Sequence, residues 1–174
     1  STEDKIIYIT WRTLITRVYS NKNIVEKPTY KDVTVCEEWH DFQNFAEWFY
    51  ENYNPETMDG WQLDKDILQK GNKMYSPETC CFVPKRVNTL FVKCDKSRSI
   101  YGIGVVKRCK KYSVNFSKNG KTLNLGVYDT IDEAFQAYKT AKEQHIKEVA
   151  DEWKDLINSR VYQAMYSWKI EITD

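Results

Sequence analysis

The sequence predicts an α+β fold in two domains, an N-terminal one over residues 1–95 and a C-terminal one over residues 100–174. Two short strands followed by a short helix are indicated over residues 61–91. In the C-terminal domain, three short β segments precede a long helical segment, which predicts a three-stranded antiparallel sheet packed on a long helix. The polar, basic stretch Lys93–Ser99 between the two patterns is the best candidate for a linker.

The elements of the N-terminal domain follow from apolar spacing and chain-breaking residues. Apolar residues recur at steps of three and four over Glu38–Tyr50, which predicts an amphipathic helix. The segment Ile6–Tyr19 is less regular, and we expect it to be helical or mixed. The remaining elements expected here are a loop at Ser20–Tyr30, a short strand at Val33–Val35, a break at Asn52–Gly60, a strand ending near Asp64, a second strand at Cys80–Val83 and a helix at Lys85–Leu90.

The C-terminal domain begins with three alternating segments. Asn119-Gly120 is a strong tight-turn signal between the second and the third of them. Thr130 and Glu133 form a capping-box pattern at the start of a long helix. Val114, Phe116, Leu123 and Leu125 would give the sheet one apolar face toward that helix. Further expectations are a half-exposed His145, continued helix over Arg160–Trp168 and a last strand containing Ile170 and Ile172.

Charge and composition limit the class of protein. The net charge is only +1, yet residues 96–127 contain eight basic residues and no acidic one, which predicts a local polyanion-binding surface. No apolar stretch is long enough to span a membrane, and the polar start Ser1–Lys5 lacks a signal-peptide pattern. We therefore expect a soluble protein of the cytoplasm. The five cysteines form no Cys-x-x-Cys pair, so reduced thiols are expected and a zinc site is not.

Four short motifs occur in order over residues 63–88: Leu63-Asp64-Lys65, Gly71-Asn72-Lys73, Thr79-Cys80-Cys81-Phe82-Val83-Pro84, and Asn88. They resemble the phage homing-endonuclease branch of the His-Asn-His (HNH) endonucleases, in which a ββα hairpin grips one divalent ion. The aromatic region from Trp11 to Phe49 is also similar to phage proteins of this group. The resemblance implies a phage protein whose first domain is an HNH-like ββα-metal domain.

The resemblance also implies roles for single residues. Asp64 and Asn88 stand at the metal-ligand positions, and their oxygen atoms suit Mg²⁺ or Mn²⁺. Lys65 stands where the family has its general-base His, and Thr79 where an Asn orients that His. A protonated lysine cannot deprotonate water, so the catalytic function is expected to be lost or altered. The candidate replacement bases are His40 and Asp66.

The residues alone also allow a simpler interpretation of this hairpin. Asp64, Lys65 and Asp66 would then form a solvated turn with a surface ion pair, and Asn72 would be a turn residue.

A second resemblance covers about forty residues from Tyr101 to Tyr138. The quoted motifs are Tyr101-Gly102-Ile103-Gly104-Val105, Asn119-Gly120-Lys121, Leu125-Gly126-Val127-Tyr128, Thr130, Glu133-Ala134 and Ala137-Tyr138. They resemble the Apetala/ethylene-response-factor (AP2/ERF) DNA-binding domain, in which the sheet lies in the major groove. The family's base-reading Arg and Trp positions hold mostly other residues here, so its sequence preference is not carried over. A basic, solvated sheet without a partner is the alternative.

The expected DNA contacts come from this sheet and its turns. Lysine mostly grips phosphate, whereas arginine and asparagine also read base edges. The face of the sheet away from the helix is expected to show Lys107, Arg108, Asn115, Ser117, Thr122 and Asn124. The predicted DNA-binding residues are these six together with Lys110, Lys111, Lys118 and Lys121.

These patterns predict a phage-type protein that binds double-stranded DNA and derives from an HNH endonuclease. The first alternative is an active nicking or homing endonuclease that depends on Mg²⁺ or Mn²⁺. The second is a host-takeover or inhibitor protein that binds a host protein, suggested by the acidic segments on both sides of the basic block. The sequence specifies neither the oligomeric state nor the DNA site.

Overall fold

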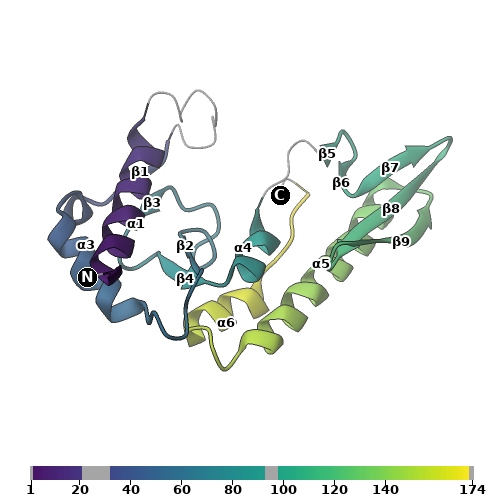
Figure 1. Ribbon diagram of the computed structural model, residues 1–174. Coiled ribbons are helices and arrows are strands. Elements are labelled where there is room, and N and C mark those ends of the chain that lie inside the picture. Colours follow the sequence, from purple (N-terminus) through teal and green to yellow (C-terminus); the bar gives the residue numbers. More distant parts are fainter. Residues whose placement is uncertain (1, 21–31, 93–97, 173–174) are drawn as a thin grey trace. The chain divides into compact units, whose positions relative to one another are not determined.

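The computed structural model confirms the α+β fold and divides into two compact units, Ser1–Thr89 and Leu90–Asp174 (Figure 1). The division falls a few residues before the predicted end of the first domain. The ranges that the structure describes are 2–20, 32–92 and 98–172. The loop expected at Ser20–Tyr30, most of the expected linker, Cys94 and Lys96 therefore lie outside the described residues.

Unit 1 is built on an aromatic core between two helices. Helix α1 (Thr2–Tyr19) buries Ile7, Leu14 and Val18. The amphipathic segment predicted over residues 38–50 is two elements, η2 (Glu37–His40) and α3 (Phe42–Asn52). The break occurs at Asp41, which is extended and accepts a hydrogen bond from the N–H of Gln43 as the N-cap of α3. The apolar period continues across that break, and for this reason periodicity alone missed it.

The ββα hairpin follows this core. Strand β2 (Gln62–Asp64) pairs antiparallel with β4 (Cys81–Val83), and α4 (Lys85–Phe91) begins two residues later. Phe82 packs against the rings of Trp48 and Phe49 at centroid distances of 5.4 and 5.0 Å, so the aromatic core fixes the position of β4. A second pair joins β1 (Thr34–Val35) to β3 (Met74–Tyr75) in parallel. Strand β1 was predicted, whereas β3 was not.

Unit 2 contains the predicted antiparallel sheet, in the order β7–β8–β9, and α5 runs along one face of it (Figure 1). Thr130 and Glu133 form the predicted capping box at the start of α5. Val105, Val114 and Phe116 are buried on the side toward α5. The elements of the unit are β5 (Arg98–Ser99), β6 (Gly102–Ile103), β7 (Val105–Arg108), β8 (Lys111–Lys118), β9 (Lys121–Tyr128), α5 (Ile131–Trp153) and α6 (Ser159–Ser167).

Gly104 allows the sheet and helix to approach closely. Its φ is +73°, and an added Cβ would lie 2.6 Å from the carbonyl oxygen of Asn115 and 2.6 Å from the ring of Tyr138. Only glycine fits this space and this backbone conformation without strain.

Three expectations for unit 2 were wrong. His145 is buried, because it lies under the sheet with its ring 5.8 Å from that of Phe116. The segment expected to be helical over Arg160–Trp168 does form a helix, α6, but not as a continuation of the long helix, which ends at Trp153; Asn158 caps α6 by accepting from the N–H of Arg160. Ile170 is not in a strand; its N–H donates to Glu143 and its carbonyl accepts from Lys139, so side chains of α5 hold this segment.

Candidate nucleic-acid interface and the Lys65 loop

The sheet of unit 2 has one face turned away from α5, here called the outer face. Residues that pair directly across an antiparallel sheet share a face, and residues two apart along a strand share it as well. The register therefore gives four rows across the outer face: Arg108–Lys111, Val106–Ser113–Val127, Asn115–Asn124 and Ser117–Thr122. These nine residues define the outer face.

A β-bulge completes this arrangement. The register shifts between Val114 and Asn115, so that Leu125 is an extra residue in β9 and Gly126 adopts a φ of +127°. Asn124 and Val127 are three positions apart and would otherwise lie on opposite faces. The bulge brings both to the outer face, which strict alternation along the sequence does not predict.

An amide network fixes two side chains on the outer face. The Nδ2 group of Asn124 donates to Ser113 Oγ at 3.1 Å and to Asn115 Oδ1 at 3.2 Å. The Oδ1 atom of Asn124 accepts from the N–H of Gly126 at 3.0 Å. Asn124 therefore uses both of its donor hydrogens within the sheet. The Nδ2 group of Asn115 makes no hydrogen bond to the part of the chain that the structure describes.

Basic residues lie at both ends of β8. The basic turn (residues 108–111) joins β7 to β8 and is exposed throughout. Lys111 pairs with Asp129 at 2.9 Å, but both side chains are exposed, so this ion pair contributes little and leaves the lysine accessible. Arg108 and Lys110 form no ion pair within the described ranges. Lys121 is exposed beside the Asn119–Gly120 turn.

Two lysines predicted to bind DNA lie on the other side of the sheet. Lys107 pairs across the strands with Tyr112, and its Nζ lies 5.8 Å from the ring centroid of Tyr101. Lys118 binds Glu148 of α5 at 2.6 Å. The predicted set therefore does not form one surface. The members on the outer face are Arg108, Lys111, Asn115, Ser117, Thr122 and Asn124. Lys110 lies in the basic turn, and Lys121 is the first residue of β9, where it pairs with Lys118 at the end of the sheet.

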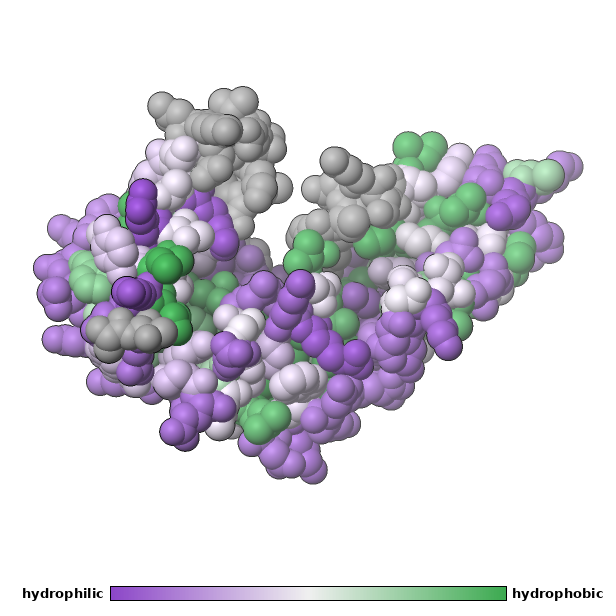
Figure 2. All heavy atoms as spheres, viewed as in Figure 1, coloured by the Kyte–Doolittle hydropathy of each residue, from purple (hydrophilic) through white to green (hydrophobic). Residues whose placement is uncertain are grey.

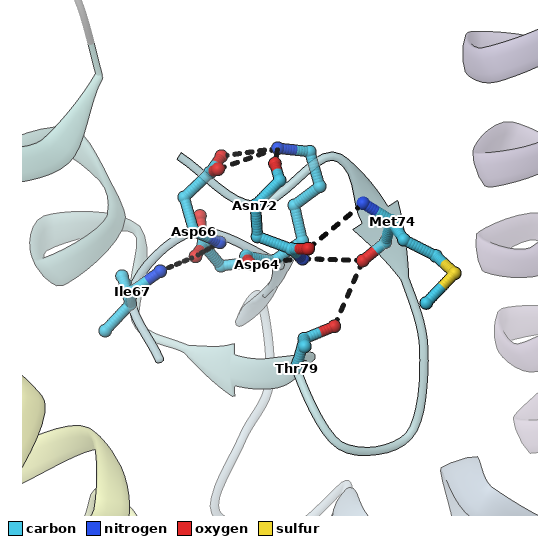
Figure 3. Close-up of polar contacts among 7 residues, drawn as sticks. Asp64, Asp66, Ile67, Asn72, Met74 and Thr79 are labelled. Carbon is cyan, nitrogen blue, oxygen red and sulfur yellow. Dashed lines mark hydrogen bonds and ion pairs between the residues drawn. The ribbon is translucent and has the colours of Figure 1, made fainter. Parts of the chain in front are cut away.

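The other candidate site lies in the loop between β2 and β3, where Lys65 is 8% exposed. Its Nζ donates to both carboxylate oxygens of Asp66, at 2.7 and 2.8 Å, and to the carbonyl oxygen of Asn72 at 2.7 Å (Figure 3). The Tyr75 ring centroid lies 5.8 Å from the same nitrogen. The ammonium is thus surrounded by oxygen atoms and an aromatic face.

Asn72 closes this loop from the opposite side. Its Nδ2 donates to the carbonyl oxygens of Lys65 (2.9 Å) and Met74 (2.6 Å), and its Oδ1 accepts from the Met74 N–H. Thr79 Oγ1 donates to the same Met74 carbonyl (Figure 3). It also shares a hydrogen bond with the Ser76 hydroxyl. Thr79 therefore supports the loop backbone. Within the described part of the chain it makes no hydrogen bond to Lys65, the residue it was expected to orient.

Each of the two predicted metal ligands makes hydrogen bonds through one of its side-chain atoms. Asp64 Oδ1 accepts from the N–H groups of Asp66 and Ile67, both at 2.7 Å, and burial raises the pKa of this carboxyl group. Asn88 Nδ2 donates to Gln62 Oε1 at 2.7 Å. Among the described residues no group of three or more His, Cys, Asp or Glu side chains is placed to hold a metal. The Lys65 ammonium adds a positive charge near Asp64, and this charge disfavours a divalent cation at that carboxylate.

The candidate bases are likewise separated. His40 Nε2 exchanges a hydrogen bond with the Tyr19 hydroxyl at 3.0 Å, and that hydroxyl also accepts from the N–H of Val35. Asp66 is paired with Lys65. The Lys65–Asp66 ion pair was considered from the sequence, whereas the contact between His40 and Tyr19 joins positions 21 residues apart that no motif relates.

The four described cysteines are free thiols: Cys36, Cys80, Cys81 and Cys109. Among the described helices, none has the length and apolar content that a membrane span requires. No protein-family model, curated protein or solved structure matches this chain.

Proposed function

We propose that this chain binds double-stranded DNA by placing the outer face of the β7–β9 sheet in the major groove. One observation supports the proposal most strongly: the outer face presents amide and hydroxyl side chains, and the basic turn lies at the edge of that face. A β-sheet surface of this width enters the major groove of B-DNA, where amides and hydroxyls meet base edges.

The basic residues supply the attraction to phosphate. Residues 96–127 lack acidic side chains, so the outer face and its turns form a positive surface in an otherwise nearly neutral protein. Lys110 in the basic turn and Lys121 at the start of β9 lie at opposite ends of β8, which suits contacts to phosphates on both sides of a groove. The exposed hydrophilic character of this unit is visible in Figure 2, where hydrophobic residues occur as separate patches among hydrophilic ones.

The test is a fluorescence-anisotropy titration of a short duplex at several salt concentrations. Lys110→Gln combined with Lys121→Gln should weaken binding and lower the salt dependence by about two counterions, since each lysine on a phosphate accounts for about one. The charge-matched control is Lys5→Gln with Lys154→Gln, two exposed lysines outside the sheet and its turns. No binding by the wild type at low salt, or equal losses in both double variants, would refute the proposal.

A structural role is proposed for the Lys65 loop. The ammonium of Lys65 holds its protons in bonds to a carboxylate and a carbonyl, and such a donor does not activate water. The loop joins β2 to β3 and β4, and its internal contacts keep the hairpin closed.

A further inference from the structure

We infer that the outer face selects A·T base pairs, with Asn115 contacting adenine and Val106 and Val127 contacting thymine methyl groups. This inference rests on the proposed function and names its preferred substrate. It follows from which donors remain unused on the outer face and from where apolar groups are exposed there.

Asn115 is the amide left available for a base. The Nδ2 group of Asn124 donates its two hydrogens to Ser113 and Asn115, and its Oδ1 accepts from the N–H of Gly126. Asn115 accepts only one of these bonds, so its Oδ1 keeps a second lone pair and its Nδ2 keeps two hydrogens. That pair of groups matches the N6 donor and N7 acceptor of adenine. Asn124 acts as a positioning residue, because it orients the Asn115 amide.

The two valines lie in the neighbouring row. Val106 and Val127 pair with Ser113 from either side and are 43% and 55% exposed. In the major groove the only methyl group is that of thymine, and apolar side chains are the groups that recognise it. Positions two apart on β8 are about 7 Å apart, which is about two base-pair steps of B-DNA. The valine row and the asparagine row therefore reach base pairs that lie two steps apart.

Guanine has no matching group in the centre of this face. Its usual partner is an arginine or lysine that binds O6 and N7. The rows that contain Ser113, Asn115 and Ser117 hold no basic residue, and Arg108 and Lys111 lie beyond the valine row at the edge. The central positions therefore favour A·T over G·C.

The experiment begins with selection of duplexes from a randomised library by the full-length wild-type protein. We expect A·T pairs to be enriched at two positions that lie two base-pair steps apart. On the selected duplex, replacing thymine by uracil removes the methyl group, and replacing adenine by 7-deazaadenine removes N7. Each replacement at a contacted pair should weaken binding by about 5-fold or more, because a good base contact discriminates by roughly 1–3 kcal/mol. These measurements need no protein variant and so do not depend on folding of a mutant.

Variants then assign the contacts. Val106→Ala should reduce the loss of affinity caused by uracil. Leu123→Ala is the control: Leu123 is as exposed as Val106, at 43%, but it lies on the other face of the sheet, so its substitution should leave the effect of uracil unchanged. Asn115→Ala should remove the sensitivity to 7-deazaadenine. Binding without A·T enrichment, or with insensitivity to both base analogues, would overturn this inference and leave the proposed function intact. Absence of any duplex binding would overturn both.

Discussion

At the scale of single residues, Lys65 places a largely buried ammonium group inside the loop between β2 and β3. It is the only lysine among the buried polar residues of the described chain, and its ammonium contacts Asp66, a backbone carbonyl and the Tyr75 ring. A lysine between two aspartates in a polar loop gives no sequence signal for burial. The surface ion pair considered as an alternative does form with Asp66, but it is partly enclosed, since Asn72 folds the loop over it.

Replacing Lys65 by Met tests this role. Methionine keeps the length of the side chain but leaves the Asn72 carbonyl and the Asp66 carboxylate without their donor. We expect a loss of about 1–2 kcal/mol in the free energy of unfolding, measured by urea denaturation of the full chain. The control is Lys73→Met, an exposed lysine of the same loop, for which the loss should stay below about 0.5 kcal/mol. Equal stability of the two variants would show that Lys65 is not structural.

Candidate residues differed in how well the sequence located them. Arg108, Asn115, Ser117, Thr122 and Asn124 were predicted to share a face, and they do, because alternation along β7 and β8 holds. Lys107 was assigned to that face together with its neighbour Arg108, although consecutive strand residues point to opposite sides. Val127 was missed because the bulge at Leu125 changes the alternation in β9.

At the scale of elements, the sequence predicted helix caps and turns correctly, because residues close together in the sequence determine them. The capping box at Thr130 and the Asn119–Gly120 turn both occur where the sequence places them. The break at Asp41 and the parallel pair β1–β3 were missed. The first is hidden by continuous apolar spacing, and the second depends on a contact between distant segments that no local pattern encodes.

Gly104 is an element-scale test of how the sheet packs on α5. Gly104→Ala would place a Cβ atom 2.6 Å from both a carbonyl oxygen and the Tyr138 ring, at a positive φ. We expect thermal unfolding to show a loss of more than about 2 kcal/mol. Gly120→Ala is the matched control, since its φ of +76° is similar but its Cβ meets nothing within 4 Å; it should lose only about 1 kcal/mol. Similar losses of stability in the two variants would mean that the positive φ, and not the close packing of sheet and helix, is the reason for glycine at position 104.

His145 predicts a pH dependence for the sheet–helix packing. Burial lowers its pKa, and the facing charged groups are Lys118, Lys142 and Glu148, of which Glu148 lies 3.6 Å from Nδ1. Because the folded state binds the proton less readily than the unfolded state, stability should fall as the pH drops through about 6.5, the ordinary value for His. The midpoint of thermal unfolding between pH 7.5 and 5 should show this decline in the wild type. The decline should be smaller in His145→Gln, and an unchanged slope in that variant would assign the effect to other groups.

At the scale of the whole molecule, the sequence predicted an α+β fold and, for unit 2, a three-stranded antiparallel sheet packed on a long helix. The evidence for function comes from the distribution of charge and not from its total, since a net charge of +1 conceals a basic block without acidic residues. The hairpin illustrates the limit of motif spacing. Its strands and helix form as predicted, yet Lys65 and Asp64 bind groups of their own loop, and Asn88 binds Gln62 of β2.

The nuclease alternative has a direct test on the whole protein. Because Lys65 stands where the HNH family has its general-base His and the described residues contain no group of three or more His, Cys, Asp or Glu placed to hold a metal, we expect no nicking of supercoiled plasmid in Mg²⁺ or Mn²⁺. The measurement is conversion to open-circular DNA on an agarose gel over several hours. The control is Asp64→Ala, and nicking that this substitution abolishes would show that the hairpin retains catalysis.

The most direct measurement of the central claim is an NMR titration of the labelled protein with a DNA duplex at low salt. The account predicts that shifts concentrate on the outer face and the basic turn, including the side-chain amide signals of Asn115, while inner residues such as Phe116 change little. A duplex that leaves the outer face unperturbed, or that shifts only residues of unit 1, would contradict the account.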